Sequence, residues 1–207
     1  MGLLIGKKAP SFSCNAVLGD GAIEESFCFE DFSRDKYAVL FFYPLDFTFV
    51  CPSEILAFAN RYEAISARNA VVVGASIDSH HTHRAWRETS LADGGIGPVP
   101  FPLVADLTRE ISLAYGVLSE EGESYYPQGV AMRATFIIDT KGIVRHQLVN
   151  DEPLGRNIDE VIRVLDALQF FEENGQVCPA GWTSGQTGMS NTPSGVASYL
   201  SEHAEKL

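Results

Sequence analysis

Short apolar runs alternate with segments of helical periodicity along the first part of the chain. Residues 37–43 and 71–77 are bulky and almost wholly apolar, which is typical of strands buried on both faces. From Pro52 onward, apolar residues recur at spacings of three and four with polar residues between them, which predicts an amphipathic helix as far as Ile65. The polar stretch 79–89, which precedes a loop rich in Gly and Pro, predicts a second helix.

A β-hairpin and a long helix are expected further along the chain. Residues 130–138 and 143–149 are rich in strand-forming residues, and the turn composition of 139–142 joins them as a hairpin. The other elements expected here are a short strand, a short helix stopped by Gly116 and a long helix closed by Gly175, at 103–105, 108–115 and 157–174.

The composition changes after Gly175. Gly, Ser, Thr and Pro dominate residues 176–207, which predicts an extended arm ending in a short helix near 196–205. We therefore expect one domain over residues 1–175 and a C-terminal arm over residues 176–207. Strands that alternate with helices, followed by a hairpin and a final helix, predict an α/β fold. Its expected class is thioredoxin-like, with a central mixed sheet flanked by helices.

The excess of acidic over basic residues limits the classes of partner that the chain can bind. The 207 residues carry 15 Lys and Arg against 27 Asp and Glu, a formal charge of -12. Such a chain repels a phosphate backbone or an anionic lipid surface, so neither nucleic acid nor membrane is expected as a partner. The apolar run 38–43 is far shorter than the roughly 20 residues that cross a bilayer. Residues 3–5 are too few for the core of a signal peptide, so we expect a cytoplasmic protein.

Cys51 is the most informative of four cysteines. Their wide spacing, without a C-x-x-C pair, argues against a zinc ribbon or a disulfide-dense scaffold. Cys51 lies between the buried strand and Pro52, a residue that suits the first turn of a helix. A thiol at this place faces free backbone N–H groups and the positive end of the helix dipole, which favour the thiolate. A lone cysteine is more often a small buried hydrophobe, so only the neighbouring residues can favour a catalytic interpretation of Cys51 over a structural one.

Two other sets of residues favour structural interpretations. Cys14 and Cys28 alternate with apolar residues beside phenylalanines, which predicts buried structural thiols. His80, His81 and His83 form a short His-rich stretch that could bind a metal ion. We favour a solvated start of the helix instead, because no carboxylate or thiol nearby completes a ligand set.

Three separated motifs give the chain a family resemblance. Pro44, Thr48 and Cys51 form the pattern P-x-x-x-T-x-x-C, Arg133 ends the string Gly-Val-Ala-Met-Arg, and residues 177–182 read Val-Cys-Pro-Ala-Gly-Trp. With further similarities along nearly the whole chain, these motifs resemble the two-Cys peroxiredoxins of the alkyl hydroperoxide reductase C type.

The resemblance implies a thiol-dependent peroxidase that reduces hydrogen peroxide and organic hydroperoxides, in antioxidant defence and redox homeostasis. Cys51 would be oxidised to a sulfenic acid, and Cys178 of the partner subunit would resolve it to a disulfide. Thioredoxin, or a flavoprotein disulfide reductase, would then reduce that disulfide. The resemblance implies no haem, no metal and no other cofactor.

Each matched residue suits this chemistry. Breaking an O–O bond needs an aligned thiolate and donors to both oxygens, because negative charge moves onto the departing oxygen. Thr48 can donate and accept through one hydroxyl, and Arg133 adds five donors and a permanent charge. Pro44 has no N–H and can shield the site from water. Glu54 and Arg156 match charged positions that the family uses to hold the arginine in place.

The resemblance also bears on assembly and regulation. It implies a homodimer and favours a pentamer of dimers, with Trp86 and residues 47–50 near the contact. Gly94-Gly95-Ile96-Gly97 resembles, and Tyr199-Leu200 partly resembles, segments of relatives that are sensitive to overoxidation. We therefore expect intermediate sensitivity, in which a second peroxide converts Cys51 to a sulfinic acid.

Two alternatives belong to other functional classes. A holdase chaperone or redox signalling protein would act as large assemblies, independently of Cys178. A thioredoxin-like disulfide oxidoreductase is disfavoured, because Cys51 is followed by Pro52, Ser53 and Glu54 and so lacks a C-x-x-C pair.

Overall fold

The chain forms two compact units. The computed structural model describes residues 2–120 and 125–206, and the units comprise residues 1–158 and 159–207. The first unit contains the sheet, and the second contains most of the long helix α6 together with the C-terminal helices. The domain boundary expected at residue 175 stays a prediction.

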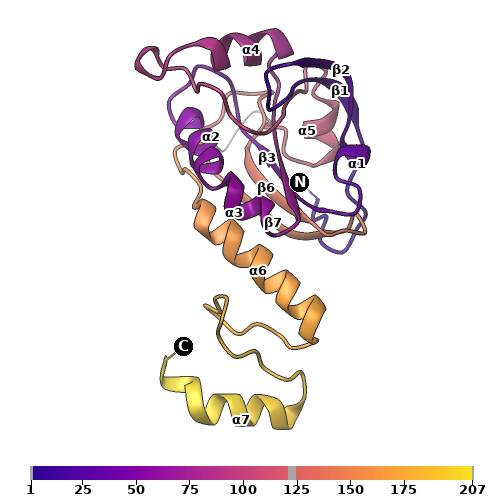
Figure 1. Ribbon diagram of the computed structural model, residues 1–207, viewed down its shortest axis with the longest axis vertical. Coiled ribbons are helices and arrows are strands. Elements are labelled where there is room, and N and C mark those ends of the chain that lie inside the picture. The colour runs from indigo at the N-terminus through magenta and orange to yellow at the C-terminus, as the bar shows by residue number, and fades with distance from the viewer. Residues whose placement is uncertain (1, 121–124, 207) are drawn as a thin grey trace. The chain divides into compact units, whose positions relative to one another are not determined.

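A mixed seven-stranded sheet lies at the centre of the first unit (Figure 1). Its order is β2-β1-β5-β4-β3-β6-β7. Strands β3, β4 and β5 are parallel, and the other neighbouring pairs are antiparallel. The mixed sheet is therefore confirmed. The strands are β1 (Ser13–Val17), β2 (Ile23–Cys28), β3 (Tyr37–Phe42), β4 (Ala70–Ser76), β5 (Leu103–Ala105), β6 (Arg133–Ile138) and β7 (Val144–Asn150).

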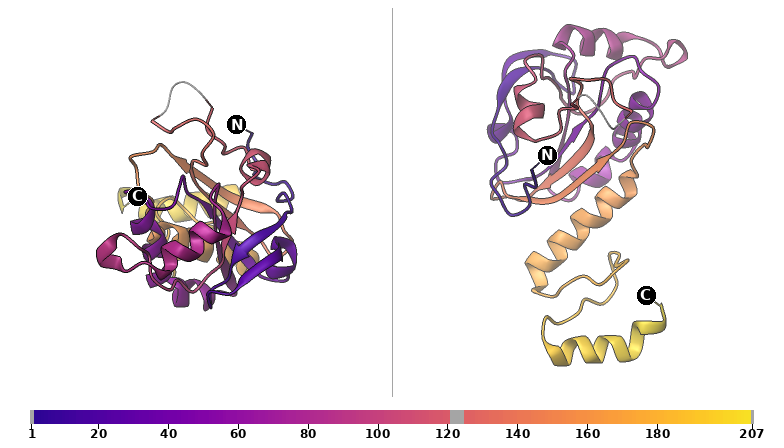
Figure 2. Two further views of the ribbon diagram at one scale, coloured as in Figure 1. Left: turned by 90° about the horizontal axis from the view of Figure 1, so that it is seen from above. Right: turned by 180° about the vertical axis from the view of Figure 1, so that it is seen from behind.

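Helices cover both faces of this sheet. Two views from opposite sides show α2 on one side of the strands and α5 on the other (Figures 1 and 2). The adjacent aromatic residues of β3 match this arrangement: Phe41 stacks on Phe58 of α2 and Phe42 packs against Tyr115, with centroid distances of 4.2 and 5.3 Å. The helices of this unit are α1 (Phe29–Phe32), α2 (Cys51–Asn60), α3 (Tyr62–Ser66), α4 (His80–Glu88), α5 (Glu110–Ala114) and the 3-10 turn η1 (Leu91–Asp93).

The apolar runs predict the central strands of the sheet but not the two strands β1 and β2 at one of its edges. Strands β3 and β4 are buried along their whole length, as expected. No strand is predicted before residue 37, yet β1 and β2 extend the sheet there. Strand β2 reads Ile-Glu-Glu-Ser-Phe-Cys, and its three central polar residues Glu24, Glu25 and Ser26 are exposed, so it lacks the apolar run that marks a buried strand.

Local geometry shifts several predicted boundaries. The helix expected from Pro52 to Ile65 divides at Arg61, whose backbone leaves the helical region. Helix α5 begins at Glu110, two residues late, because Arg109 is left-handed with φ 65°. Strand β6 begins at Arg133 and not at residue 130.

The second unit follows the predicted pattern with one earlier start. Helix α6 (Ile158–Asn174) matches the expected range. Helix α7 (Pro193–His203) begins three residues before the predicted position, because the Thr192 hydroxyl accepts from the Gly195 N–H and Pro193 occupies the first turn. The 3-10 turn η2 (Ala204–Lys206) follows it. Among the helices described in residues 2–120 and 125–206, none is long and apolar enough to cross a membrane.

Candidate active site

Cys51 is the first residue of α2, at the end of the loop that leaves β3. Val50 precedes it as the N-cap residue without a side-chain hydrogen bond, and Pro52 lies in the first turn, as predicted. Cys51 is fully buried. The sulfur therefore lies at the positive end of a ten-residue helix, away from bulk water.

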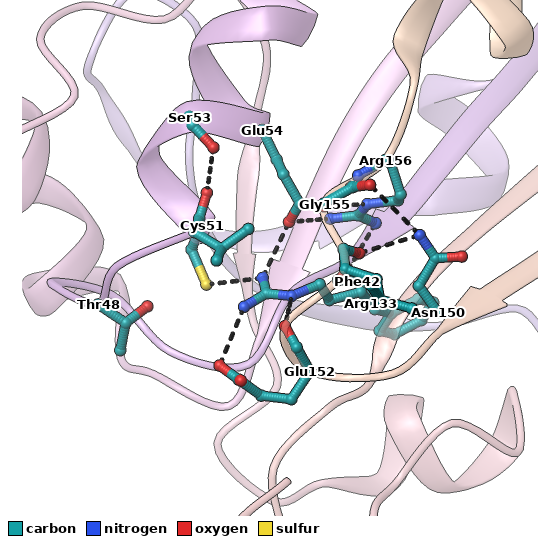
Figure 3. A network of polar contacts seen from close by, with 12 residues as sticks. Phe42, Thr48, Cys51, Ser53, Glu54, Arg133, Asn150, Glu152, Gly155 and Arg156 are labelled. Carbon is teal, nitrogen blue, oxygen red and sulfur yellow. Dashed lines mark hydrogen bonds and ion pairs between the residues drawn. The ribbon is translucent and has the colours of Figure 1, made fainter. Parts of the chain in front are cut away.

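Arg133 supplies a cation to this sulfur. It is the first residue of β6 and only 1% exposed, and its Nη1 lies 3.2 Å from Cys51 Sγ (Figure 3). Burial lowers the pKa of Arg133, but the hydrogen bond and charge of Cys51, followed by Glu54, outweigh burial and raise it. The guanidinium therefore stays charged and stabilises negative charge on the sulfur.

Glu54 lies one helical turn after Cys51 and joins two arginines. Its Oε2 accepts from Arg133 Nη1 at 3.0 Å and from Arg156 Nη2 at 2.7 Å. Its Oε1 accepts from the Arg156 backbone N–H and Nε, at 3.0 and 2.8 Å. Arg156 Nη1 in turn donates to the carbonyls of Phe42 and Ala134. This buried network fixes the helix start relative to β3 and β6.

Thr48 and Pro44 lie on the loop between β3 and α2. Pro44 is buried and Thr48 is half-buried, and Figure 3 shows Thr48 on the loop beside Cys51. The Thr48 hydroxyl donates to the Leu45 carbonyl at 2.8 Å, which leaves its oxygen lone pairs available as acceptors. The structure thus brings four predicted residues of the first unit together near Cys51: Thr48, Glu54, Arg133 and Arg156. Pro44 is buried at the start of the same loop.

Comparisons with known proteins agree with this geometry. The AhpC/TSA family matches residues 5–147, and the C-terminal domain of 1-Cys peroxiredoxin matches residues 167–202. Alkyl hydroperoxide reductase C of Helicobacter pylori is 48% identical over 205 residues, covering 99% of this chain and 100% of that protein. Peroxiredoxin-2 of Bos taurus is 46% identical over 199 residues, 96% of each chain.

A solved structure extends the similarity to three dimensions. The reduced 2-Cys peroxiredoxin of Plasmodium vivax gives a TM-score of 0.90 at 44% identity, covering 97% of this chain and 100% of that chain. The chain belongs to the AhpC/TSA family of peroxiredoxins. The thioredoxin-like fold class is confirmed, and peroxiredoxins are thiol-dependent peroxidases.

Two residues of this peroxiredoxin's site were outside the sequence-based prediction. The first is Glu152, whose backbone carbonyl accepts from Arg133 Nε at 2.6 Å and whose side-chain Oε1 lies 3.3 Å from Arg133 Nη2. The Tyr126 hydroxyl accepts from the Arg133 N–H and donates to the Asn150 carbonyl, at 2.8 and 2.7 Å. Arg133 and Asn150 are paired in the antiparallel ladder of β6 and β7, so the Tyr126 hydroxyl links the backbones of these two strands. Helical or strand periodicity could not have identified Glu152 or Tyr126 as site residues, because both lie in loops.

Cys178 lies in the second unit of the peroxiredoxin. It is half-buried, and its Sγ lies 3.4 Å from the Ala167 carbonyl of α6. Burial raises the pKa of the Cys178 thiol, and the Arg163 guanidinium opposes part of that rise. Arg163 also donates to the Trp182 carbonyl and pairs with Glu160. Cys178 is thus held on α6 beside a cation.

The histidine stretch requires a correction. His83 is completely buried, with Nδ1 2.7 Å from Asp46 Oδ2 and Nε2 3.2 Å from the Val104 carbonyl, so the prediction of a solvated residue was wrong here. Helical periodicity turns His83 toward the sheet, whereas His81 is exposed and His80 half-buried. In the described part of the chain, no group of three or more His, Cys, Asp and Glu is arranged to hold a metal ion.

The other two cysteines are half-buried, so the prediction that they are buried was wrong in degree. Cys14 pairs with Phe27, and Ser13 pairs with Cys28, in the antiparallel ladder of β1 and β2. The two thiols therefore project from opposite faces of the sheet, which excludes a disulfide between them in this fold. Burial, and then the charge of Asp106, raises the pKa of Cys14 to about 12.

Proposed function

We propose that Cys51 is the peroxidatic cysteine of this peroxiredoxin and that Cys178 resolves its sulfenic acid. The observation that carries the first role is the 3.2 Å contact between Cys51 Sγ and Arg133 Nη1 at a helix N-terminus. The reactive form of a cysteine is its thiolate, which a cation and a helix N-terminus stabilise.

Peroxide reduction begins at the Cys51 sulfur. The thiolate attacks the terminal oxygen of the hydroperoxide, an S–O bond forms and the O–O bond breaks. The departing alkoxide takes a proton and leaves as an alcohol, or as water when the substrate is hydrogen peroxide. The sulfur loses two electrons and becomes a sulfenic acid.

The neighbouring residues support this step in distinct ways. Arg133 stabilises the charge that moves from sulfur to oxygen, since donors aimed at developing charge lower the barrier. Thr48 offers a hydroxyl from the adjoining loop, and buried Pro44 keeps a competing donor away from the sulfur. Glu54 and Arg156 position Arg133 through the buried carboxylate that both arginines share.

Resolution completes the cycle. The Cys178 thiolate of the partner subunit attacks the sulfenic sulfur, a disulfide forms and the hydroxyl leaves as water after taking a proton. An external dithiol, from thioredoxin or a flavoprotein disulfide reductase, then reduces the disulfide by exchange. We propose that this cycle runs in the cytoplasm.

The proposed assembly is a homodimer that further associates to a decamer. Phe47 and Phe49, on the loop before Cys51, are 51% and 95% exposed, and two exposed aromatic residues on one loop suit a protein contact. Phe47 packs on Trp86, which is itself fully buried, so the phenylalanines would form the contact and Trp86 would support them. Sedimentation of the reduced protein tests this, and a dimer at all concentrations contradicts the decamer.

Stopped-flow oxidation tests both cysteine roles. Reduced wild type, Cys51→Ser and Cys178→Ser are mixed with one equivalent of hydrogen peroxide and then separated on a non-reducing gel. We expect fast consumption by wild type and Cys178→Ser, none by Cys51→Ser, and a covalent dimer only in wild type. Equal slow consumption by all three proteins would show that Cys51 is an ordinary thiol.

A further inference from the structure

Glu152 places a carboxylate on the arginine that contacts the reactive sulfur. Its Oε1 lies 3.3 Å from Arg133 Nη2, and Figure 3 shows the carboxylate directed at the guanidinium. Glu152 is 34% exposed, whereas Arg133 is 1% and Glu54 2% exposed. Among the charged groups of residues 2–120 and 125–206 that contact Arg133, Glu152 is therefore the one that reaches solvent.

The loop that carries Glu152 is held in place by its own hydrogen bonds. The backbone carbonyl of Glu152 accepts from Arg133 Nε, and the backbone N–H of Glu152 donates to Asp151 Oδ1 at 2.7 Å. The Asn150 side chain donates to the Leu154 carbonyl and closes the loop. These bonds fix the backbone of Glu152 on both sides, which places its side chain within reach of the guanidinium.

The charges around the sulfur do not balance when Cys51 is ionised. Arg156 makes three hydrogen bonds to Glu54 and neutralises it. Arg133 is then left to balance both the Cys51 thiolate and Glu152. The reactive form of the site therefore carries one excess negative charge, at the group that faces solvent.

We propose that Glu152 determines substrate specificity, by making Cys51 react faster with neutral hydroperoxides than with anionic ones. This inference rests on the proposed role of Cys51. An anionic hydroperoxide that approaches the sulfur meets the Glu152 carboxylate, and it also competes with that carboxylate for Arg133 Nη2. A neutral hydroperoxide of the same size is not repelled in this way.

Two hydroperoxides of similar size test the proposal. tert-Butyl hydroperoxide is neutral, and 2-hydroperoxy-2-methylpropanoate replaces one methyl group by a carboxylate. Their second-order rate constants with reduced protein are measured by stopped flow at pH 7.5 for wild type and Glu152→Gln. We expect Glu152→Gln to raise the ratio of the anionic to the neutral rate constant by roughly 5- to 10-fold. The neutral substrate serves as an internal reference for any general change in the reactivity of the variant.

Glu88→Gln is the matched control. Glu88 is exposed on α4, pairs with Arg84, and its substitution removes the same unit of charge from a protein of formal charge -12. We expect its ratio to equal that of wild type. Raising the salt concentration from 0.02 to 0.5 M should raise the anionic rate constant of wild type more than that of Glu152→Gln, because screening weakens repulsion.

The outcomes separate this inference from the proposed function. An unchanged ratio in Glu152→Gln, or the same rise in Glu88→Gln, overturns the role of Glu152 while Cys51 stays the reactive residue. If Cys51→Ser reacts with either hydroperoxide as fast as wild type, the proposed function itself fails.

Discussion

The two cysteines of the proposed cycle have opposite surroundings. Cys51 is fully buried, and the carboxylate of Glu54 joins the two buried arginines of its network. Cys178 is half-buried on the second unit, with a carbonyl beside its sulfur and a partly exposed Arg163 nearby. The Cys51 sulfur accepts a hydrogen bond from a buried guanidinium, whereas burial raises the pKa of the Cys178 thiol and Arg163 offsets only part of that rise.

The difference fits the two steps. Peroxide cleavage needs donors held in place before the reaction, since reorganising them during the reaction costs rate. Attack on a sulfenic acid needs a thiol that can reach another sulfur and can become a thiolate. The network around Cys51 is therefore expected to be sensitive to single substitutions, and the surroundings of Cys178 less so.

The largest expected effect comes from breaking the buried network at Glu54. Glu54→Gln leaves Arg133 and Arg156 without their shared carboxylate, which should lower the free energy of unfolding by about 3–5 kcal/mol. Urea denaturation of the reduced protein measures this. The exposed pair of Glu88 and Arg84 provides the control, and Glu88→Gln should change stability by less than about 0.5 kcal/mol. A loss below 1 kcal/mol in Glu54→Gln would contradict a tightly coupled network.

The next effect is kinetic. Arg133→Met keeps an apolar stem but removes the donor 3.2 Å from the sulfur, so peroxide oxidation of Cys51 should slow by about 10²- to 10³-fold. Stopped-flow rates with hydrogen peroxide measure it, with the exposed Arg84→Gln as a control of equal charge change. A decrease of only about twofold would mean that the helix N-terminus alone supports the reaction.

The smallest effect is expected at the second cysteine. The pKa of Cys178 is raised by burial and partly lowered by Arg163, so Arg163→Gln should move it further upward. Below that pKa the thiolate fraction rises with pH, so disulfide formation should quicken from pH 6 to 9 in both proteins. The variant should be about two- to fivefold slower at pH 7.

Rates measured at high pH distinguish an electrostatic effect of Arg163 on Cys178 from a structural one. Arg163 also donates to the Trp182 carbonyl, so its loss could loosen the segment around Cys178. If the charge is responsible, the rates of variant and wild type should converge as the pH rises past the raised pKa of Cys178 in both proteins. A constant ratio at every pH would show that Arg163 acts only as a structural support.

The sequence alone determined the central strands, the long helices and the motif residues that precede Cys51 in the chain. Apolar runs mark β3 and β4 because strands buried on both faces need no polar alternation. The motif residues Pro44, Thr48 and Cys51 lie within eight positions, so local geometry brings them together. The edge strand β2 carries no such signal, because one side of it meets water.

Only the tertiary structure decided the partners that come from distant segments. Arg133 and Arg156 meet Glu54 across separations of 79 and 102 residues, a convergence that the family resemblance anticipated and helical or strand periodicity does not encode. Glu152 and Tyr126 come from loops, and His83 is buried although its neighbour His81 is exposed. Periodicity specifies which face of an element is apolar, but the chain must fold before a polar side chain acquires its partner. The solvent-facing carboxylate of Glu152, which contacts Arg133, is likewise a partner that only the folded structure provides.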